Sequence, residues 1–353
     1  MNEVITDKDK EYEAMEQSSA PGPDQAMSDR VNNRSLRPRS EAFKEFMTTG
    51  WDDNEPQIEP LESSKYTPAR LEALGKAFPG ERIVIPAGQP KVRNNDCDYA
   101  FRPDTTFSYY TGLGEDFEAG AVLVLNPVDP DSPEAKAGKT HVPELFVAPR
   151  ANHYTQDFFM NAHYGEYWVG PRAGVKEMTA MTGIETNDIA QLPDALSKDV
   201  GTEAGAVRVR VIREADPAIT SMVEEIREAN GFADPDNNTA ADDKLHEFAA
   251  EARMCKDEYE VREMRKAVAA TKHGFDNSLR KIPSSLGKPR SERMLEGAFN
   301  AISREEGNEV GYDTIIASGA HAPILHWMRN TGTVESGELL LIISLVLGTL
   351  AGE

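Results

Sequence analysis

Two histidines near the end of the chain have the clearest potential for chemistry. His321 and His326 lie in the segment SGAHAPILHW, which follows an apolar stretch and a glycine turn. An imidazole can donate a hydrogen bond, exchange a proton near neutral pH or ligate a metal. A histidine beside a tryptophan is nevertheless more often a hydrogen-bonded core residue than a catalyst. From the residues alone, both interpretations of this pair stand.

A second group of histidines occurs earlier in the chain. His153 and His163 lie in ANHYTQDFFMNAHYGEYW together with Asp157 and Glu166, and His141 precedes them. Imidazole and carboxylate groups are common metal ligands, so a metal centre is conceivable. Their spacing, however, fits no compact histidine and carboxylate motif. We therefore expect these three to be scattered surface histidines.

Aromatic residues are concentrated in the segment CDYAFRPDTTFSYYTGL. Aromatic side chains bury a large area while keeping a polar group, so this density predicts core packing first and an interface second. The aromatic cluster near Tyr109 is therefore a candidate interface for self-association. The aromatic residues are Tyr99, Phe101, Phe107, Tyr109 and Tyr110, with Arg102 and Asp104 beside them.

The composition predicts a soluble globular protein. Hydrophobic residues make up 39% of the 353 residues and charged residues 28%, which is ordinary for a folded chain. A net charge of -22 repels nucleic-acid phosphates, so no nucleic-acid partner is expected. The N-terminal residues have no basic and apolar export signal, and Cys97 and Cys255 match no disulfide or zinc pattern. These features favour the cytoplasm.

The most apolar run of the chain extends from Leu339 to Ala351. It is shorter than the ~20 residues that a helix needs to cross a bilayer. We therefore interpret it as buried strand and expect no membrane partner.

Strands alternate with helices through most of the chain, which predicts an α/β fold. Thr67 is the expected N-cap of a helix at residues 67–78, and residues 217–230 form a further helix. A turn-rich loop at 231–244 should precede a helical region that breaks at Lys256-Asp257. A helix at 291–306 should begin with Ser291 as N-cap and end at Gly307. Strands are expected at residues 82–88, 119–126, 144–149, 207–212, 311–319 and 338–347.

These elements suggest three regions. Residues 1–64 are acidic and polar, and we predict that they are largely disordered apart from a short helix around SEAFKEFMTTGW. Residues 65–235 form an α/β domain. Residues 244–353 form a second domain that carries His321 and His326.

From about Tyr66 to Ile342 the chain resembles the aminopeptidase P family, also called Xaa-Pro aminopeptidases. The first region resembles the N-terminal domain of that family through IVIPAG, NNDCDYAFRPDTTFSYYTGL, AVLVL and YWVGPRAG. The second resembles the start of its pita-bread catalytic domain through CKDEYEVREMRKAVAATKHGF, EGNEVGYDTIIASGAHAPILHW and SGELLLI. The resemblance implies a creatinase-type α/β N-terminal domain followed by an incomplete α+β pita-bread domain.

The resemblance also implies an activity. The family removes the first residue from peptides whose second residue is proline. It uses two manganese ions held by two aspartates, a histidine and two glutamates, and paired divalent ions activate water and stabilise a developing oxyanion. His326 matches the family histidine that contacts substrate near the scissile bond, where a hydrogen-bond donor can stabilise the transition state. Family members commonly self-associate, so a homo-oligomer is expected.

The resemblance stops where the metal ligands should begin. Ile343 stands at the position of the first metal-binding aspartate, and the second aspartate would fall beyond Glu353. We therefore expect a C-terminally truncated chain with a foreign-looking apolar tail from residue 343, no metal ligands, exposed strand edges in the second region, and no activity.

Three functions other than that of an inactive, truncated family member are compatible with the sequence. The chain could be an active, manganese-dependent Xaa-Pro aminopeptidase, a non-catalytic oligomerisation or interaction fragment, or a relative of prolidase and creatinase. A plain α/β ligand-binding module is the fallback, although no glycine-rich phosphate loop supports it.

Overall fold

The computed structural model describes residues 41–52, 58–95, 97–115, 117, 119–203, 205–232 and 234–348. Most of the tail predicted to be disordered therefore lies outside the described residues. Within its described part, the expected short helix is present as α3 (Glu41–Thr48), and a single 3-10 turn, η1 (Glu62–Lys65), leads into the first lobe. We use "first lobe" for residues 58–252 and "second lobe" for residues 258–348.

The first lobe is built on a mixed five-stranded sheet with the strand order β6-β5-β4-β1-β7. The inner strands pair antiparallel, β1 with β4 and β4 with β5, whereas β7 and β6 pair parallel at the two edges. Four strands fall where they were predicted, and β6 was missed because its residues ETND are polar. The strands are β1 (Glu81–Pro86), β4 (Val122–Pro127), β5 (His141–Val147), β6 (Glu185–Asp188) and β7 (Arg208–Val211).

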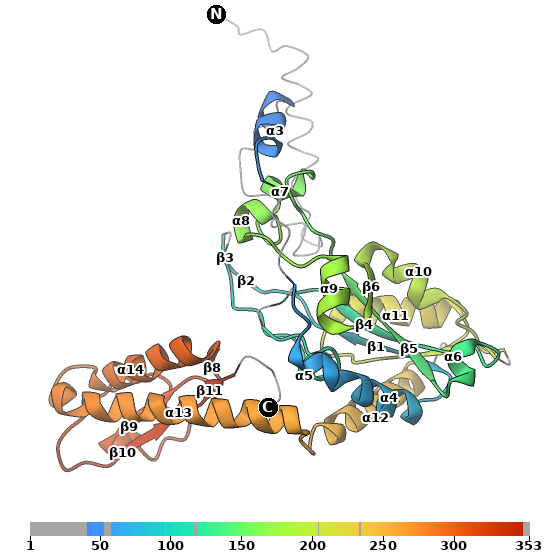
Figure 1. The fold of residues 1–353 in the computed structure, drawn as a ribbon. Helices are drawn as coiled ribbons and strands as arrows, with labels where there is room; N and C mark the ends of the chain where they lie inside the picture. Colours follow the sequence, from blue (N-terminus) through green and yellow to red (C-terminus); the bar gives the residue numbers. More distant parts are fainter. Residues whose placement is uncertain are drawn as a thin grey trace, which may run out of the picture.

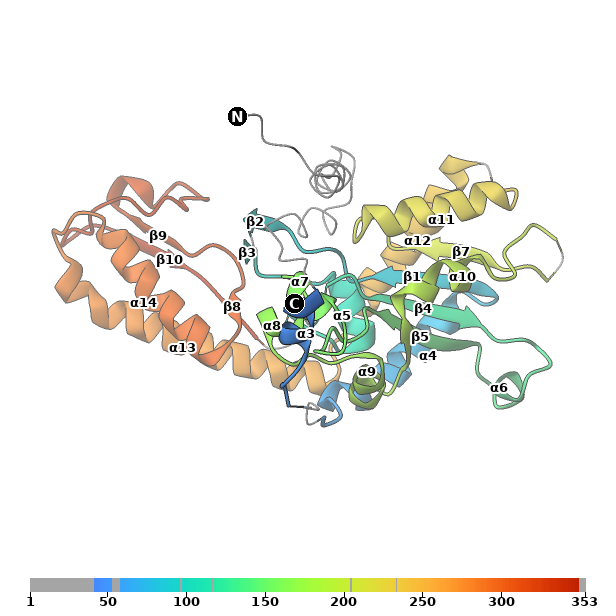
Figure 2. The same cartoon turned by 90° about the horizontal axis from the view of Figure 1, so that it is seen from above.

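Helices cover both faces of this sheet, as Figures 1 and 2 show. Alternate residues of β1 point to opposite faces: Ile83 and Ile85 lie in one hydrophobic cluster and Val84 in the other. The first cluster packs under α4 (Thr67–Ala77), α5 (Thr105–Thr111), α9 (Val175–Thr182) and α12 (Pro235–Ala252). The second packs under α10 (Leu192–Ser197) and α11 (Pro217–Ala229).

Helix α12 corrects one prediction. Residues 235–244 were expected to form a loop, but they are helical. Asp234 accepts a hydrogen bond from the backbone N–H of Asn237 and Pro235 occupies the first turn, a combination that starts helices. Leu245 and Ala249 of this helix lie in the first cluster. The helix therefore packs on the first lobe.

Short elements complete the first lobe. The hairpin β2 and β3 projects from the sheet together with α7 and α8, toward α3 in Figure 1. These elements are β2 (Val92–Asn94), β3 (Cys97–Asp98), α6 (Pro133–Lys136), α7 (Asp157–Met160), α8 (Glu166–Val169) and η2 (Ile189–Gln191).

The second lobe is a pair of helices against two small two-stranded sheets. The predicted break at Lys256-Asp257 is confirmed, because Asp257 forms a capping box with Glu260 at the start of α13. The apolar segment predicted as one strand forms two short strands with different partners, β10 with β9 and β11 with β8. The elements are α13 (Glu258–Ser285), α14 (Ser291–Glu306), β8 (Glu309–Val310), β9 (Ile315–Ser318), η3 (Gly319–His321), β10 (Leu340–Ile343) and β11 (Val346–Leu347).

A buried arginine joins the two lobes. The guanidinium of Arg70 on α4 donates to Asp257 Oδ2 at 3.0 and 2.6 Å and to the carbonyl of Tyr109 at 2.7 Å. Tyr66 stacks on Tyr259 with ring centroids 5.4 Å apart. The first turn of α13 is thus fixed against the first lobe, and the rest of this long helix extends away from it (Figure 1).

Candidate functional site

The predicted substrate histidine lies on the loop between β9 and β10. The chain leaves β9, turns at Gly319 with a φ of 54°, and forms the 3-10 turn η3 before reaching His326. His326 is exposed, and within the described residues no polar contact involves its side chain. Its imidazole is therefore accessible to a molecule from solvent.

His321 has a different position from its neighbour. Its ring stacks on Trp327, with centroids 3.8 Å apart and an interplanar angle of 22°. Its Nδ1 lies 2.9 Å from Oε1 of Glu292. The two histidines of SGAHAPILHW are thus not brought together: His321 is a packed residue of the loop and His326 is a free surface group.

Glu292 is the one residue of this site that the sequence reasoning missed. It lies in the first turn of α14 and is fully buried. Its Oε1 also accepts from the backbone N–H of Ser318 at 2.9 Å, and its Oε2 accepts from Trp327 Nε1 at 2.9 Å and from the N–H of Gly332 at 2.5 Å. Every donor is distant in sequence, so local spacing could not have revealed the contacts.

The hydrogen bonds keep this carboxylate ionised. Burial alone would raise the pKa of Glu292, since it disfavours charge. The hydrogen bonds from Trp327, His321, Ser318 and Gly332 act in the opposite direction, and the pKa is lowered from its usual value. The four donors therefore favour the charged form of this carboxylate more than the environment of an ordinary glutamate does.

His141, His153 and His163 were expected to be surface residues, and the structure places them otherwise. His141 is buried and its Nε2 donates to the carbonyl of Glu81 at 2.8 Å; burial lowers its pKa. His153 is also buried, with its ring against Tyr154. His163 pairs with Asp98 on β3. Each has a local structural environment of its own.

The aromatic segment is mainly core, as predicted. Phe107, Tyr109 and Tyr110 lie in the first hydrophobic cluster, and only Tyr99 is largely exposed. Burial raises the pKa of both tyrosines of the pair. Tyr109 and Tyr110 are thus buried and Tyr99 of the same cluster is exposed, and the candidate interface near Tyr109 stays a prediction.

Comparison with known proteins identifies the two lobes. The family model "Aminopeptidase P, N-terminal domain" matches residues 68–207, and "Metallopeptidase family M24" matches residues 262–347. Xaa-Pro aminopeptidase 1 of Streptomyces coelicolor is 37% identical over 305 residues, which are 86% of this chain and 56% of that protein. Xaa-Pro aminopeptidase 2 of the same organism is 34% identical over 317 residues, 90% of this chain and 61% of that protein.

The chain belongs to the aminopeptidase P family. Its fold agrees: aminopeptidase P from Escherichia coli in its low-pH form has a TM-score of 0.62 at 22% identity, and the match covers 82% of this chain and 60% of that one. The chain spans 56% and 61% of the length of the two Streptomyces coelicolor relatives. The M24 match includes residues 343–347, so the predicted departure from the family after Ile342 stays a prediction.

Membership in the M24 family implies a metal centre, and the described residues of this chain do not fit one. Within residues 41–348, apart from the short gaps in the description, no three His, Cys, Asp or Glu side chains are grouped so that they could hold an ion. Ile343, which stands at the position that the resemblance gives to the first aspartate, lies in the apolar strand β10. No catalytic step at these residues is therefore assigned to a metal ion.

No helix in the described part of the chain has both the length and the apolar character that a membrane span requires.

Proposed function

We propose that this chain is an Xaa-Pro aminopeptidase family member that binds no catalytic metal and does not hydrolyse peptides by itself. The observation that carries the proposal is the lack of a three-donor group within the described residues. The family resemblance assigns the reaction to two manganese ions. A two-metal site cannot form without its deprotonated ligands, so neither activated water nor oxyanion stabilisation by metal would be available.

Within this proposal, His326 contacts a peptide near the bond that intact relatives cleave. Its exposure, the lack of an intramolecular partner within the described residues and the anchored residues on both sides of it support that role. An accessible imidazole can donate to a peptide carbonyl, which is the contribution that the family histidine makes by resemblance. The expected ligands are peptides with proline in the second position.

The division into domains is also a proposal. The regions 1–64, 65–235 and 244–353 follow from the sequence. Because α12 (Pro235–Ala252) packs on the first lobe, its packing favours a later boundary between the second and third regions, at the break between α12 and α13. A cytoplasmic location is proposed as well. Cys255 is a free, exposed thiol, which suits a reducing compartment.

Two alternative proposals concern self-association and a different peptide preference, and each has its own test. Self-association of the chain is proposed from the family resemblance, and light scattering tests it. A prolidase-type or creatinase-type preference would follow from the same M24 match, and peptide length in a cleavage assay separates it from an Xaa-Pro aminopeptidase.

Calorimetry with Mn²⁺ followed by an Xaa-Pro tripeptide cleavage assay on the same sample tests the main proposal. Xaa-Pro aminopeptidase 1 of Streptomyces coelicolor serves as the intact comparison. We expect no stoichiometric binding and no cleavage above the buffer blank. Binding of two ions per chain together with cleavage would falsify the proposal and would assign the activity to this chain.

A further inference from the structure

We infer that Glu292 is the positioning residue of the His326 loop, residues 318–334, and this inference rests on the proposed peptide contact of His326. The loop contains the exposed histidine, yet it has little regular structure beyond the turn η3. A loop of that kind can present a side chain in one place only if other contacts fix its path.

The arrangement of the four donors identifies what fixes this path. Ser318 stands at the entry of the loop and Gly332 near its exit, and both donate backbone N–H groups to the same carboxylate. His321 and Trp327 lie on either side of the residues that lead to His326, and both donate their ring N–H groups to it. One buried side chain therefore holds the loop at four points, with residues 322–326 between its two inner anchors.

The neighbours of Glu292 on α14 support the same conclusion. The hydroxyl of Ser291 accepts from the N–H of Val334 at 2.6 Å, and the guanidinium of Arg293 donates twice to the carbonyl of Arg329 at 3.2 Å. Three consecutive residues of α14 thus contact the loop at several points along its length. Asn330, which bonds to the backbone of Thr314 and Ile316, holds the loop against β9 as well.

Close packing at Gly332 shows that the carboxylate fits this space specifically. A Cβ atom at residue 332 would lie 2.5 Å from Glu292 Oε1 and 2.7 Å from His321 Nδ1. No side chain can therefore occupy that position while Glu292 and His321 keep theirs.

Glutamine at position 292 is the most informative substitution. Glu292→Gln keeps the size of the side chain but replaces one oxygen by an NH2 group, which would face two N–H donors without an acceptor. Glu296→Gln is the matched control, because Glu296 lies one turn further along the same helix and makes no polar contact within the described residues. Both variants exchange a carboxylate for an amide on the same helix, and only Glu292→Gln removes contacts to the loop.

The indole N–H resonances of the three tryptophans supply a direct readout. Trp51 and Trp168 donate to backbone carbonyls in other parts of the molecule, whereas Trp327 donates to Glu292. Trp→Phe variants assign the three signals. In Glu292→Gln we expect the Trp327 signal to shift upfield and the other two to stay in place, and in Glu296→Gln we expect no change.

Trypsin cleavage after Arg329 supplies a second readout, since this exposed residue is the only Lys or Arg of the loop. We expect nicking at this site to become about tenfold faster in Glu292→Gln, because the loop opens more often once a buried donor loses its acceptor. A third readout is the shift of the His326 imidazole signal on addition of an Xaa-Pro tripeptide, which should be lost in the same variant.

Each outcome decides the inference. An unmoved Trp327 signal with unchanged nicking, or equal effects of both variants, would overturn it. If Glu292→Gln unfolds the second lobe, Trp327→Phe removes one donor and leaves the carboxylate, and faster nicking in that variant supports the inference whereas unchanged nicking overturns it. If the loop opens but the wild-type His326 signal never responds to peptide, the proposed peptide contact has failed while the positioning role stands.

Discussion

The two lobes differ in the size of their buried hydrophobic clusters. The first lobe buries two hydrophobic clusters, one on each face of its sheet. The second lobe has two clusters with only three buried residues each, and many of its large apolar side chains are exposed. These are Met264, Val268, Leu279, Leu286, Tyr312, Ile324, Leu325, Met328 and Leu339.

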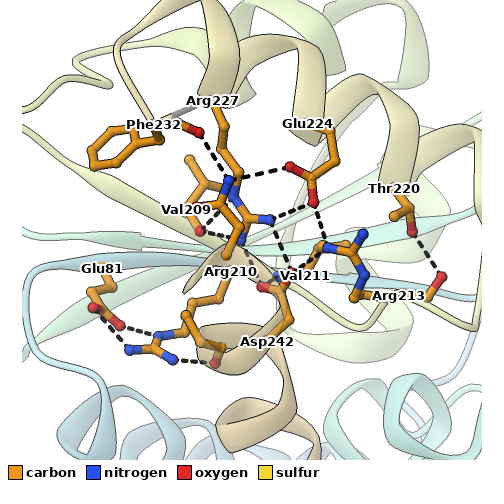
Figure 3. Close-up of polar contacts among 12 residues, drawn as sticks. Glu81, Val209, Arg210, Val211, Arg213, Thr220, Glu224, Arg227, Phe232 and Asp242 are labelled. Carbon is orange, nitrogen blue, oxygen red and sulfur yellow. Dashed lines mark hydrogen bonds and ion pairs between the residues drawn. The ribbon is translucent and has the colours of Figure 1, made fainter. Parts of the chain in front are cut away.

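Their buried charges differ in the same way. In the first lobe, Asp242 on α12 pairs with Arg227 on α11, and the pair binds the helices to strand β7, as Figure 3 shows. In the second lobe, the buried Glu292 binds a loop rather than a helix or a sheet. The comparison suggests that the first lobe is stabilised as a scaffold, whereas polar contacts in the second lobe shape a surface.

Removal of Asp242 should have the largest effect. Asp242→Ala removes the buried carboxylate of this pair and leaves Arg227 with only the partly exposed Glu224, and breaking a buried pair costs about 3–5 kcal/mol. Urea unfolding followed by Trp168 emission should show this loss in the first lobe. Asp243→Ala, the exposed neighbour on α12, is the control and should change stability by less than ~0.5 kcal/mol. Equal effects of the two variants would contradict the scaffold role.

Acid should affect the second lobe through Glu292. Because its pKa is lowered in the folded state, the ionised carboxylate stabilises the fold fully above the ordinary glutamate pKa of about 4.3, and this contribution is lost as the pH falls through the lower, folded-state pKa. Protonation leaves at least one donor without an acceptor, a cost of about 1–3 kcal/mol.

Trp327 emission against pH measures this loss. In wild type, the signal should change at acid pH, and in Glu292→Gln the acid-dependent change should be absent because the variant has no carboxylate at this position to protonate. Trp168 emission provides the reference for the first lobe. An identical acid response of wild type and Glu292→Gln would assign the effect to other carboxylates.

The fold was largely predictable because apolar periodicity marks its core elements. Strands β1, β4, β5 and β7 are apolar runs, and α11 has a clear helical stripe. Edge strand β6 is polar and gives no such signal. The predicted N-caps Thr67 and Ser291 are each one residue inside their helices, and the hydroxyl of Ser291 is used in a long-range contact instead.

The candidate site was predictable only in part. His326 was identified through the family resemblance, and no local pattern separates it from His321. Glu292 was missed because a glutamate in the first turn of a helix is ordinary. What makes it unusual is the set of donors from residues 318–332, and such contacts arise only when the tertiary structure forms.

Alanine substitution at two glycines of the second lobe should change the free energy of unfolding in opposite directions. A Cβ at Gly274 on α13 would lie 2.7 Å from the ring of Phe299, whereas a Cβ at Gly297 on α14 would meet nothing within 4 Å. Gly274→Ala should lower the free energy of unfolding by about 1–2 kcal/mol. Overpacking against Phe299 costs about 1–3 kcal/mol, which exceeds the stability gained from the higher helix propensity of alanine. Gly297→Ala should gain up to about 1 kcal/mol.

Urea unfolding followed by Trp327 emission measures both glycine variants. If Gly274→Ala is as stable as Gly297→Ala, the small cluster around Phe299 accommodates a methyl group without strain. The second lobe would then be packed more loosely than its buried residues indicate, and the contrast between the lobes would become sharper.

The smallest effect should come from the exposed pair that spans the lobe junction. Arg262 on α13 pairs with Glu62, with side chains 39% and 53% exposed, and exposed pairs contribute about 0–1 kcal/mol and weaken with salt. Glu62→Gln should therefore lower the stability only slightly at low salt and have no effect at high salt, as urea unfolding at the two salt concentrations can show. The nearby pair of Arg70 and Asp257 has one partner buried and two short hydrogen bonds, so the junction should not depend on Glu62. A salt-independent loss above ~2 kcal/mol in Glu62→Gln would mean that the lobes are coupled through the surface pair as well, and that the second lobe relies on the first for much of its order.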